Sequence, residues 1–428
     1  MPHGFSTSRL YLPKLITVWK EGYTTERLRR DILAALTVAI VALPLSMAIA
    51  VASGVPPARG LYTAIIGGAV VSALGGSRYQ IGGPAGAFIV LVAATAARFG
   101  VEGLLLTVLL SGTFLALLGI FRVGSLIRHI PHAVTVGFTC GIAATIAASQ
   151  LKDFAGLTLQ SKEPGPFFPK LAALFHALSS LTPAALLLGA VTTLVIVVLA
   201  RRKPTWPGML MAVALASLLA WSFHLPVETI GTRFGGIPHG LLAPRLPLAT
   251  WQAVLAVLPN ALSFTLLGGI ESLLSAKVAD GMTGRFHRSN MELVAQGFAN
   301  IASALFGGIS VTGTIARTAT NIRAGAQTPL SGILHSAFLL LFMMVAAPLA
   351  SYIPLAALAG VLMVVSWNMA EKGEFQRLLL SWQSAIVLLA TFVLTLVYDL
   401  TTGIVAGCLS AVLLYFTLGG PRLPEEGA

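Results

Sequence analysis

The sequence predicts an all-α polytopic membrane protein in which 14 transmembrane segments form an inverted repeat of seven plus seven. Three observations lead to this fold class. Of the 428 residues, 56% are hydrophobic and only 10% are charged, whereas a soluble domain carries about 25% charged residues. The charged residues are separated by uncharged runs that approach or exceed the roughly 20 residues needed to cross a bilayer. Two Gly-Gly sequences, at 82–83 and 307–308, lie deep in corresponding apolar regions of the two halves.

The first seven segments are bounded by charged residues. They lie between residues 31 and 59, 59 and 78, 78 and 98, 102 and 122, 128 and 152, 170 and 201, and 203 and 228. The longest polar interruption follows, a loop rich in proline and glycine from about Pro226 to Pro247. Proline and glycine at this density favour a loop over a helix, so we predict the boundary between the two halves here.

The second half gives seven more segments. They lie between residues 245 and 271, 292 and 317, 312 and 323, 377 and 399, and 399 and 422, with two further helices sharing the run from 323 to 371. An odd number of segments makes the second repeat enter from the opposite side of the membrane, so the repeats are inverted. Lysine and arginine are enriched in the loops that face the cytoplasm when both termini are cytoplasmic, which predicts a multi-pass protein of the plasma (inner) membrane.

Composition also excludes several classes of function. The net charge is +12, but the basic residues lie between apolar runs instead of forming the stripe that nucleic-acid binding requires. Cys140 and Cys408 lie inside apolar runs, where packing is a more common role than a disulfide or a metal site. No constellation of nucleophile and base or of metal ligands is present, so we expect no enzyme activity, cofactor, metal or nucleic-acid partner.

The two Gly-Gly sequences each precede small residues and a short apolar run that ends near a glycine, Gly100 or Gly325. This pattern predicts that helices 3 and 10 are short half-helices that begin inside the membrane. Half-helices at corresponding positions of two repeats mark the binding site of many transporters. Their N-termini carry partial positive charge, so two of them facing one point favour an anion.

Several motifs resemble the SulP (sulfate permease) anion transporters. They are VALPLSMAIA at 41–50, GVPPARGLY at 54–62, GGSR at 75–78, GGP at 82–84, ARTA at 316–319, GAQTPLSG at 325–332 and DLTTGI at 399–404. The resemblance covers about residues 30 to 418. One departure is Leu45, because many members carry glutamine after the proline of helix 1. Members usually continue into a cytoplasmic STAS domain, which we expect to be absent here.

The resemblance implies movement of a substrate-carrying core against a gate. The implied division is a cytoplasmic N-terminal segment (1–30), core helices 1–4 (31–128), gate helices 5–7 (129–225), an inter-repeat loop (226–250), core helices 8–11 (251–350), gate helices 12–14 (351–418) and a cytoplasmic tail (419–428). It also implies a small inorganic or organic anion as substrate, the lipid bilayer as surroundings and a possible homodimer.

The anion is expected between the N-termini of helices 3 and 10. The predicted substrate-binding residues are Ile49, Gly83, Ala85, Ala87, Phe88, Thr314, Ala316 and Arg317. Arg317 either supplements the helix dipoles or forms a salt bridge with Glu271. The hydroxyl groups of Ser310, Thr312 and Thr314 either donate to substrate or satisfy backbone groups freed at the helix break.

Glu271 and Ser275 are the predicted coupling-ion residues. Glu271 lies late in the apolar run of helix 8, and ionisable groups inside membranes commonly serve as ion or proton sites. Ser275 follows one turn later on the same face. In sodium-coupled bicarbonate relatives an acid at the position of Glu271 helps to bind sodium, and helix 10 supplies a hydroxyl where this chain has Ile315. That departure favours a proton over sodium.

The sequence therefore predicts a secondary active anion transporter, with proton-coupled symport of a small dicarboxylate (fumarate-like) or another oxyanion as the leading hypothesis. The alternatives are a sodium-coupled bicarbonate or sulfate symporter, an anion exchanger and an uncoupled anion channel. A membrane enzyme and a purine or pyrimidine carrier of the same architecture fit the motifs less well.

Overall fold

The computed structural model describes residues 11–124, 131–159, 163–164, 166–204, 206–247, 249–398 and 400–418. Each of the 14 predicted segments corresponds to a helical element, and the expected tail at 419–428 lies outside the described residues. Within the described residues, eight helical stretches are long and apolar enough to span a membrane by themselves, and three shorter apolar helices accompany them. The predicted polytopic α-helical fold class is confirmed.

The first half of the chain contains a short N-terminal helix, the first repeat and a short helix in the inter-repeat loop. The elements are, in order, α1 (Lys14–Lys20), α2 (Thr25–Ala52), α3 (Pro57–Tyr62), a π-helical turn (Thr63–Gly67), α4 (Gly68–Leu74), β1 (Gly82–Gly83), a 3₁₀ turn (Gly86–Phe88), α5 (Ile89–Ile120), α7 (His132–Ala155), α8 (Phe167–His176), a 3₁₀ turn (Leu178–Ser180), α9 (Pro183–Arg202), α10 (Gly208–Ser222) and α11 (Ile230–Phe234).

The second repeat contains the corresponding elements in the same order. They are α12 (Trp251–Thr283), α13 (Ser289–Leu305), β2 (Thr312–Gly313), α14 (Ile315–Arg323), α15 (Leu330–Ala350), α16 (Leu355–Met369), α17 (Lys372–Leu379), α18 (Trp382–Val397) and α19 (Leu400–Leu418).

Helices 3 and 4 of the prediction are joined in one element, α5, which bends at Gly100. This glycine has φ 70° and ψ −172°, a conformation that side chains with a Cβ rarely adopt. The predicted half-helix 3 therefore runs from the 3₁₀ turn to this bend. Its counterpart α14 ends at Arg323, just before Gly325 with φ 93°. Both glycines that the sequence indicated as helix ends thus have positive φ.

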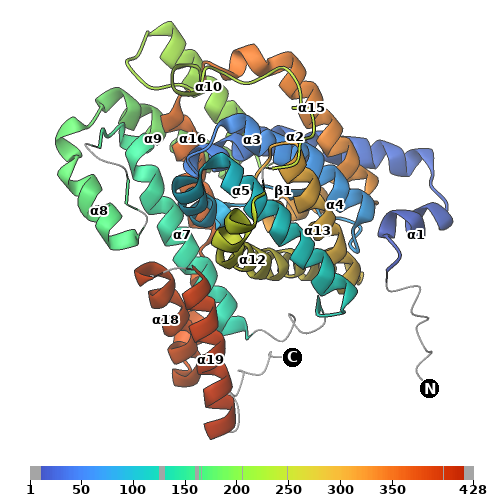
Figure 1. Ribbon diagram of the computed structural model, residues 1–428. Coiled ribbons are helices and arrows are strands. Elements are labelled where there is room, and N and C mark those ends of the chain that lie inside the picture. Colours follow the sequence, from blue (N-terminus) through green and yellow to red (C-terminus); the bar gives the residue numbers. More distant parts are fainter. Residues whose placement is uncertain are drawn as a thin grey trace, which may run out of the picture.

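The helices pack in two groups, and in Figure 1 α7, α9, α18 and α19 lie to the left of α4, α13 and α15. One group contains α2 to α5 and α12 to α15, gathered around β1 and β2. The other contains α7, α9, α10, α16, α18 and α19. Within each group neighbouring helices pack extensively, while α2 also touches α10 and α16 across the seam. The grouping follows the implied core and gate, whose exact boundaries stay a prediction.

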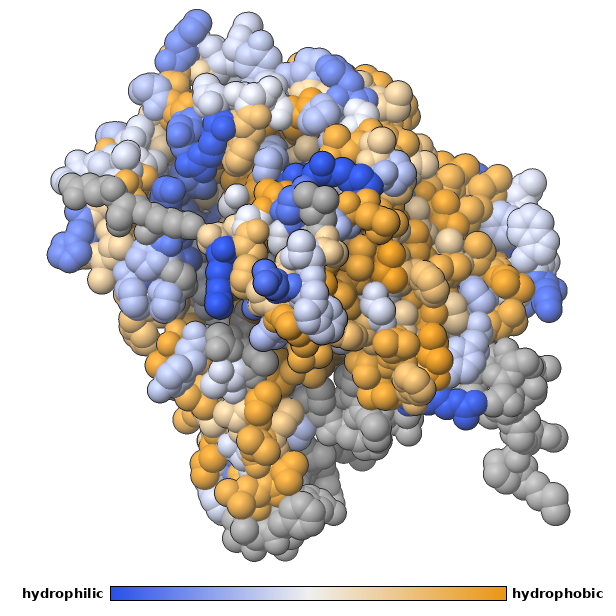
Figure 2. Space-filling model, viewed as in Figure 1, coloured by the Kyte–Doolittle hydropathy of each residue, from blue (hydrophilic) through white to orange (hydrophobic). Residues whose placement is uncertain are grey.

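Figure 2 shows apolar side chains covering much of the visible flank, with hydrophilic residues gathered mainly at the upper rim. Large exposed apolar side chains include Leu187, Leu194, Leu218, Val345 and Leu413. Such a surface is costly in water and suits contact with lipid acyl chains.

Two buried carboxylates tie distant loops of the core together. Asp31 of α2 is fully buried and accepts hydrogen bonds from the amides of Gln327 (2.7 Å) and Thr328 (3.1 Å), from the Thr328 hydroxyl and from the Tyr23 hydroxyl. Glu292 of α13 accepts from the amides of residues 76 and 77 at 2.8 and 3.0 Å. These bonds satisfy carboxylate oxygens that would otherwise be expensive to bury, and they hold the loops that precede α15 and β1.

Candidate anion-binding and coupling site

The two short helices meet through a small antiparallel ladder. Gly82 of β1 lies opposite Gly313 of β2, and Gly83 lies opposite Thr312. Next to the ladder, the Thr314 amide donates to the carbonyl of Ile81 at 3.1 Å. The extended segments that lead into α5 and α14 are therefore paired by main-chain hydrogen bonds, which satisfy backbone groups that water cannot reach in the middle of a membrane protein.

The region where β1 and β2 pair is called the crossing below. Its glycines leave room for two neighbouring side chains, those of Gln80 and Arg317. A Cβ atom at Gly313 would lie 1.4 Å from Nε2 of Gln80, and one at Gly83 would lie 2.1 Å from Nη1 of Arg317. Contacts under 3.0 Å are essentially never seen for real Cβ atoms. The space next to Gly83 is therefore occupied by the guanidinium group of Arg317.

Arg317 lies in the first turn of α14 and is 1% exposed. Its Nη2 donates to the Ser46 hydroxyl at 3.1 Å and to the Pro84 carbonyl at 3.3 Å, whereas Nε and Nη1 have no partner among the described residues. No described carboxylate forms an ion pair with it, so the salt bridge to Glu271 considered above is not formed. A buried cation without a counter-ion is unfavourable, which makes this position receptive to an anion.

Helix α12 contacts the crossing through the residue after Glu271. The hydroxyl groups of Ser272 and Thr312 share a hydrogen bond of 2.8 Å, and Gln80 Nε2 donates to the Ser272 carbonyl at 3.1 Å. Glu271 is partly buried, and its Oε2 atom is fully buried without a hydrogen-bond partner among the described residues. The carboxyl group therefore has an unused oxygen, and it belongs to the residue that precedes Ser272 in α12.

The second predicted coupling residue is bonded to α14. Ser275 is fully buried, and its hydroxyl donates to Thr318 Oγ1 at 3.3 Å. Thr318 Oγ1 in turn accepts from the Ile81 amide at 3.1 Å. Glu271 and Ser275 thus lie on one helix beside the start of α14, as predicted. Through Thr318, these hydrogen bonds connect Ser275 to Ile81 in the segment that precedes β1.

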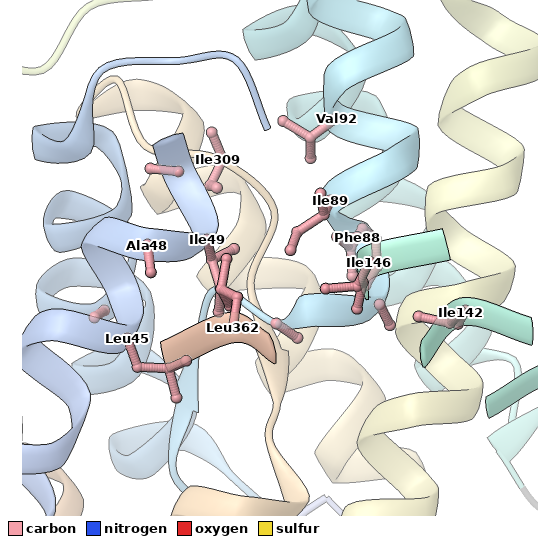
Figure 3. Close-up of a cluster of buried hydrophobic side chains, with 14 of the residues drawn as sticks. Leu45, Ala48, Ile49, Phe88, Ile89, Val92, Ile142, Ile146, Ile309 and Leu362 are labelled. Atoms are coloured by element: carbon pink, nitrogen blue, oxygen red, sulfur yellow. The ribbon is translucent and has the colours of Figure 1, made fainter. Parts of the chain in front are cut away.

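The crossing faces the second helix group through an apolar seam, shown in Figure 3. Leu362 of α16 lies next to Ile49 of α2, and Ile146 of α7 lies next to Phe88. The Phe88 ring also packs edge-on against Phe264 at a centroid distance of 5.4 Å. Ile49, Phe88 and Phe264 belong to the helix group that contains the crossing, and Ile146 and Leu362 belong to the other group. The candidate site therefore borders the seam between the two groups.

The structure brings the eight predicted substrate residues to this crossing and its seam. Ile49, Gly83, Ala85, Ala87, Phe88, Thr314 and Arg317 are buried, whereas Ala316 at the start of α14 is exposed. The Thr314 hydroxyl is directed to the Ile81 carbonyl at 3.3 Å. The hydroxyls of Ser310 and Thr312 are hydrogen-bonded to side chains, those of Asn300 and Ser272, so they are engaged within the protein.

The sequence did not indicate three of the residues that shape the site. Ser46 and Gln80 are ordinary polar residues in their segments, and Ser272 resembles the other small residues of α12. Their partners lie 40 to 271 positions away along the chain, so no local pattern could have identified them. The short ladder was also not predicted, although both strands contain glycine from the sequence regions that pointed to the site.

The chain was compared with known proteins. Residues 28–392 match the model of the sulfate permease family. A protein of Bacillus subtilis (strain 168) named putative sulfate transporter YvdB is 42% identical over 397 residues, covering 92% of this chain and 75% of that protein. The bicarbonate transporter BicA of Picosynechococcus is 31% identical over 405 residues, covering 90% of this chain and 70% of its own length.

Solved structures agree with this assignment. The transmembrane domain of a cyanobacterial bicarbonate transporter BicA has a TM-score of 0.80 and 31% identity, with coverage of 89% of this chain and 98% of that one. Murine Solute Carrier 26 family member A9 in the inward-facing state has a TM-score of 0.85 at 18% identity, covering 97% of this chain and 73% of that one, and supports the fold alone. The protein is a multi-pass membrane anion transporter rather than an enzyme, and it belongs to the sulfate permease family.

Proposed function

We propose that this protein is a proton-coupled symporter of a small oxyanion, with sulfate, bicarbonate and a fumarate-like dicarboxylate as the candidate substrates. The observation that carries the proposal is that two charged groups, one at the crossing on α14 and one next to Ser272 on α12, each have buried atoms without a hydrogen-bond partner among the described residues. Arg317 has free donors and no counter-ion, and Glu271 has a buried oxygen without a donor. The first is suited to hold an anion, and the second is suited to take up a proton.

In this proposal the anion binds between Arg317 and the N-terminus of α14. The first amide groups of a helix have no intrahelical acceptor, so they add donors to those of the guanidinium group. A proton on Glu271 removes a negative charge that would repel the incoming anion. The bound anion and proton are then carried across the membrane together. The helix group that contains the crossing moves against the group that contains α7 and α16, and the two groups slide along the seam at Ile49 and Leu362.

Sodium coupling is the second candidate, because Glu271 with Ser275 offers oxygen ligands. One feature favours the proton: Ile315 provides no side-chain oxygen at the start of α14. We also propose a plasma (inner) membrane location with both termini cytoplasmic, and a homodimer as the assembly.

The test is uptake of radiolabelled sulfate, bicarbonate and fumarate into proteoliposomes, with an inward proton gradient, an inward sodium gradient or neither. Accumulation of one anion that a protonophore abolishes is the expected result. In Glu271→Gln, proton-driven accumulation is lost while exchange of internal for external anion is retained. Accumulation that depends on sodium alone, or proton-driven uptake unchanged in Glu271→Gln, contradicts the proposal.

A further inference from the structure

A histidine in the core has no partner for either ring nitrogen. His335 lies in the second turn of α15 and is 0% exposed. Neither Nδ1 nor Nε2 has a hydrogen-bond partner among the described residues. An imidazole ring always carries at least one N–H group, and buried polar groups are nearly always hydrogen-bonded. A ring left unsatisfied on both sides therefore calls for a functional explanation.

The charged neighbour of His335 is Arg317. Helices α14 and α15 meet where Asn321 Nδ2 donates to the Ser331 hydroxyl at 3.0 Å. Asn321 follows Arg317 by one helical turn and Ser331 precedes His335 by one turn, so Arg317 and His335 lie on the faces of the two helices that meet. Both side chains are buried with unsatisfied nitrogen atoms. A fixed cation and a group that can become a cation thus share one buried region. Apolar surroundings screen charges weakly, so the two positive charges repel each other much more than they would in water.

The other elements packed against α15 carry the following titratable and charged groups. These elements are α2, α3, the π-helical turn and α4. Asp31 of α2 is held by the amides that precede α15, and Arg59 of α3 donates to the Gly307 carbonyl and stands beside Tyr62. The π-helical turn and α4 contain no ionisable residue. The remaining charged residues of α2 are in its first two turns: Glu26, Arg27, Arg29 and Arg30.

We propose that His335 is a second proton-binding site whose protonation is linked to anion binding at Arg317. The inference rests on the proposed function and adds a second site to it. Without an anion, the charge of Arg317 keeps His335 neutral. A bound anion compensates Arg317, so His335 then accepts a proton from solvent, and one proton is held with one anion. Because linkage is reciprocal, a proton on His335 tightens anion binding by the same factor.

The experiment is equilibrium binding of radiolabelled sulfate to the purified protein between pH 5.5 and pH 8, a range in which sulfate does not change its charge. Fumarate is the probe if sulfate does not bind. His335→Gln keeps a hydrogen-bonding side chain but binds no proton, and His335→Asn is the second variant should the first not fold. His176→Gln is the matched control, because His176 is exposed at the end of α8.

In the wild type, the dissociation constant is expected to fall as pH falls, approaching tenfold per pH unit for one linked proton. His335→Gln is expected to lose most of this slope while its affinity at pH 8 stays within about twofold, and His176→Gln is expected to match the wild type. Unchanged pH dependence in His335→Gln, or no pH dependence in the wild type, overturns the inference. Glu271→Gln separates the two proposals. If Glu271→Gln loses proton-driven uptake but keeps pH-dependent anion binding, the coupling role of Glu271 and the proton site at His335 are both supported. If Glu271→Gln loses all pH dependence of anion binding, only the role of His335 is overturned.

Discussion

Replacing Gly83 by alanine tests whether Arg317 must occupy its observed position for anion binding. The added Cβ atom would stand 2.1 Å from Nη1 and 3.2 Å from Cζ of Arg317, where ordinary contact begins at 3.4 Å. The guanidinium group must therefore shift by more than 1 Å. The two hydrogen bonds of Nη2, to Ser46 and Pro84, are already 3.1 and 3.3 Å long, so this shift breaks at least one of them.

The expected effect follows from one charge-assisted hydrogen bond. Misplacing Arg317 removes about 1.5–3 kcal/mol of anion binding, which corresponds to a loss in affinity of about 10- to 150-fold. The assay is the concentration dependence of anion uptake into proteoliposomes, together with equilibrium binding of the same anion. A KM that rises by this factor at an unchanged thermal midpoint indicates that the site is altered while the fold is kept.

The matched control is Gly268→Ala in α12. Its Cβ atom would make only ordinary contacts, at 3.5 Å to Leu115 and 3.6 Å to Phe88. This variant is expected to transport like the wild type. An affinity of Gly83→Ala within twofold of the wild type would refute the reasoning, because it would mean that Arg317 does not contribute from this position.

Three further predictions concern the crossing and the supports of the core. Gly313→Ala should abolish uptake because its Cβ atom overlaps Gln80, and the double variant with Gln80→Ala should recover part of it; no recovery contradicts the steric explanation. Asp31→Ala should lower the free energy of unfolding in detergent by at least about 2 kcal/mol, because buried amide donors lose their acceptor. Asp31→Asn should lower it less, and equal thermal midpoints of the two variants would contradict this prediction. Burial lowers the pKa of Lys14 from 10.5 to about 8. The unfolded chain therefore binds more protons between these values, so stability should rise from pH 8 to pH 10.5 and Lys14→Met should flatten that rise; an equal rise in this variant contradicts the assignment.

Much of the fold could be predicted because the membrane imposes a strong pattern on sequence. Long uncharged runs located the 14 segments, and glycine located the ends of the two half-helices at Gly100 and Gly325. The break at Gly100 was also predictable, because the backbone there is non-helical and separates the two helices that α5 contains. The π-helical turn that interrupts the second segment at Thr63–Gly67 was not predicted.

The candidate site was predictable in its backbone and less so in its contacts. The Gly-Gly pairs and the ARTA motif located the crossing and Arg317. The unsatisfied state of Arg317 and the inward direction of the Ser310 and Thr312 hydroxyls became visible only in three dimensions. His335 shows the same limit: as a single histidine in an apolar helix it carries no sequence signal, and its proximity to Arg317 follows from how α14 and α15 fold back on each other.

The ladder between β1 and β2 has a consequence for how such a protein could change its substrate. Main-chain atoms hold the crossing, and glycine provides the space, so the pairing of β1 with β2 does not depend on the side chains of Ala85, Ala87 or Ala316. Larger or polar residues at those three positions would change the surroundings of the candidate site while the two half-helices stay aligned. In such a scaffold the main-chain pairing of β1 with β2 stays the same while the side chains beside it change. Anion selectivity can therefore diverge among related proteins without a change in the fold of the core.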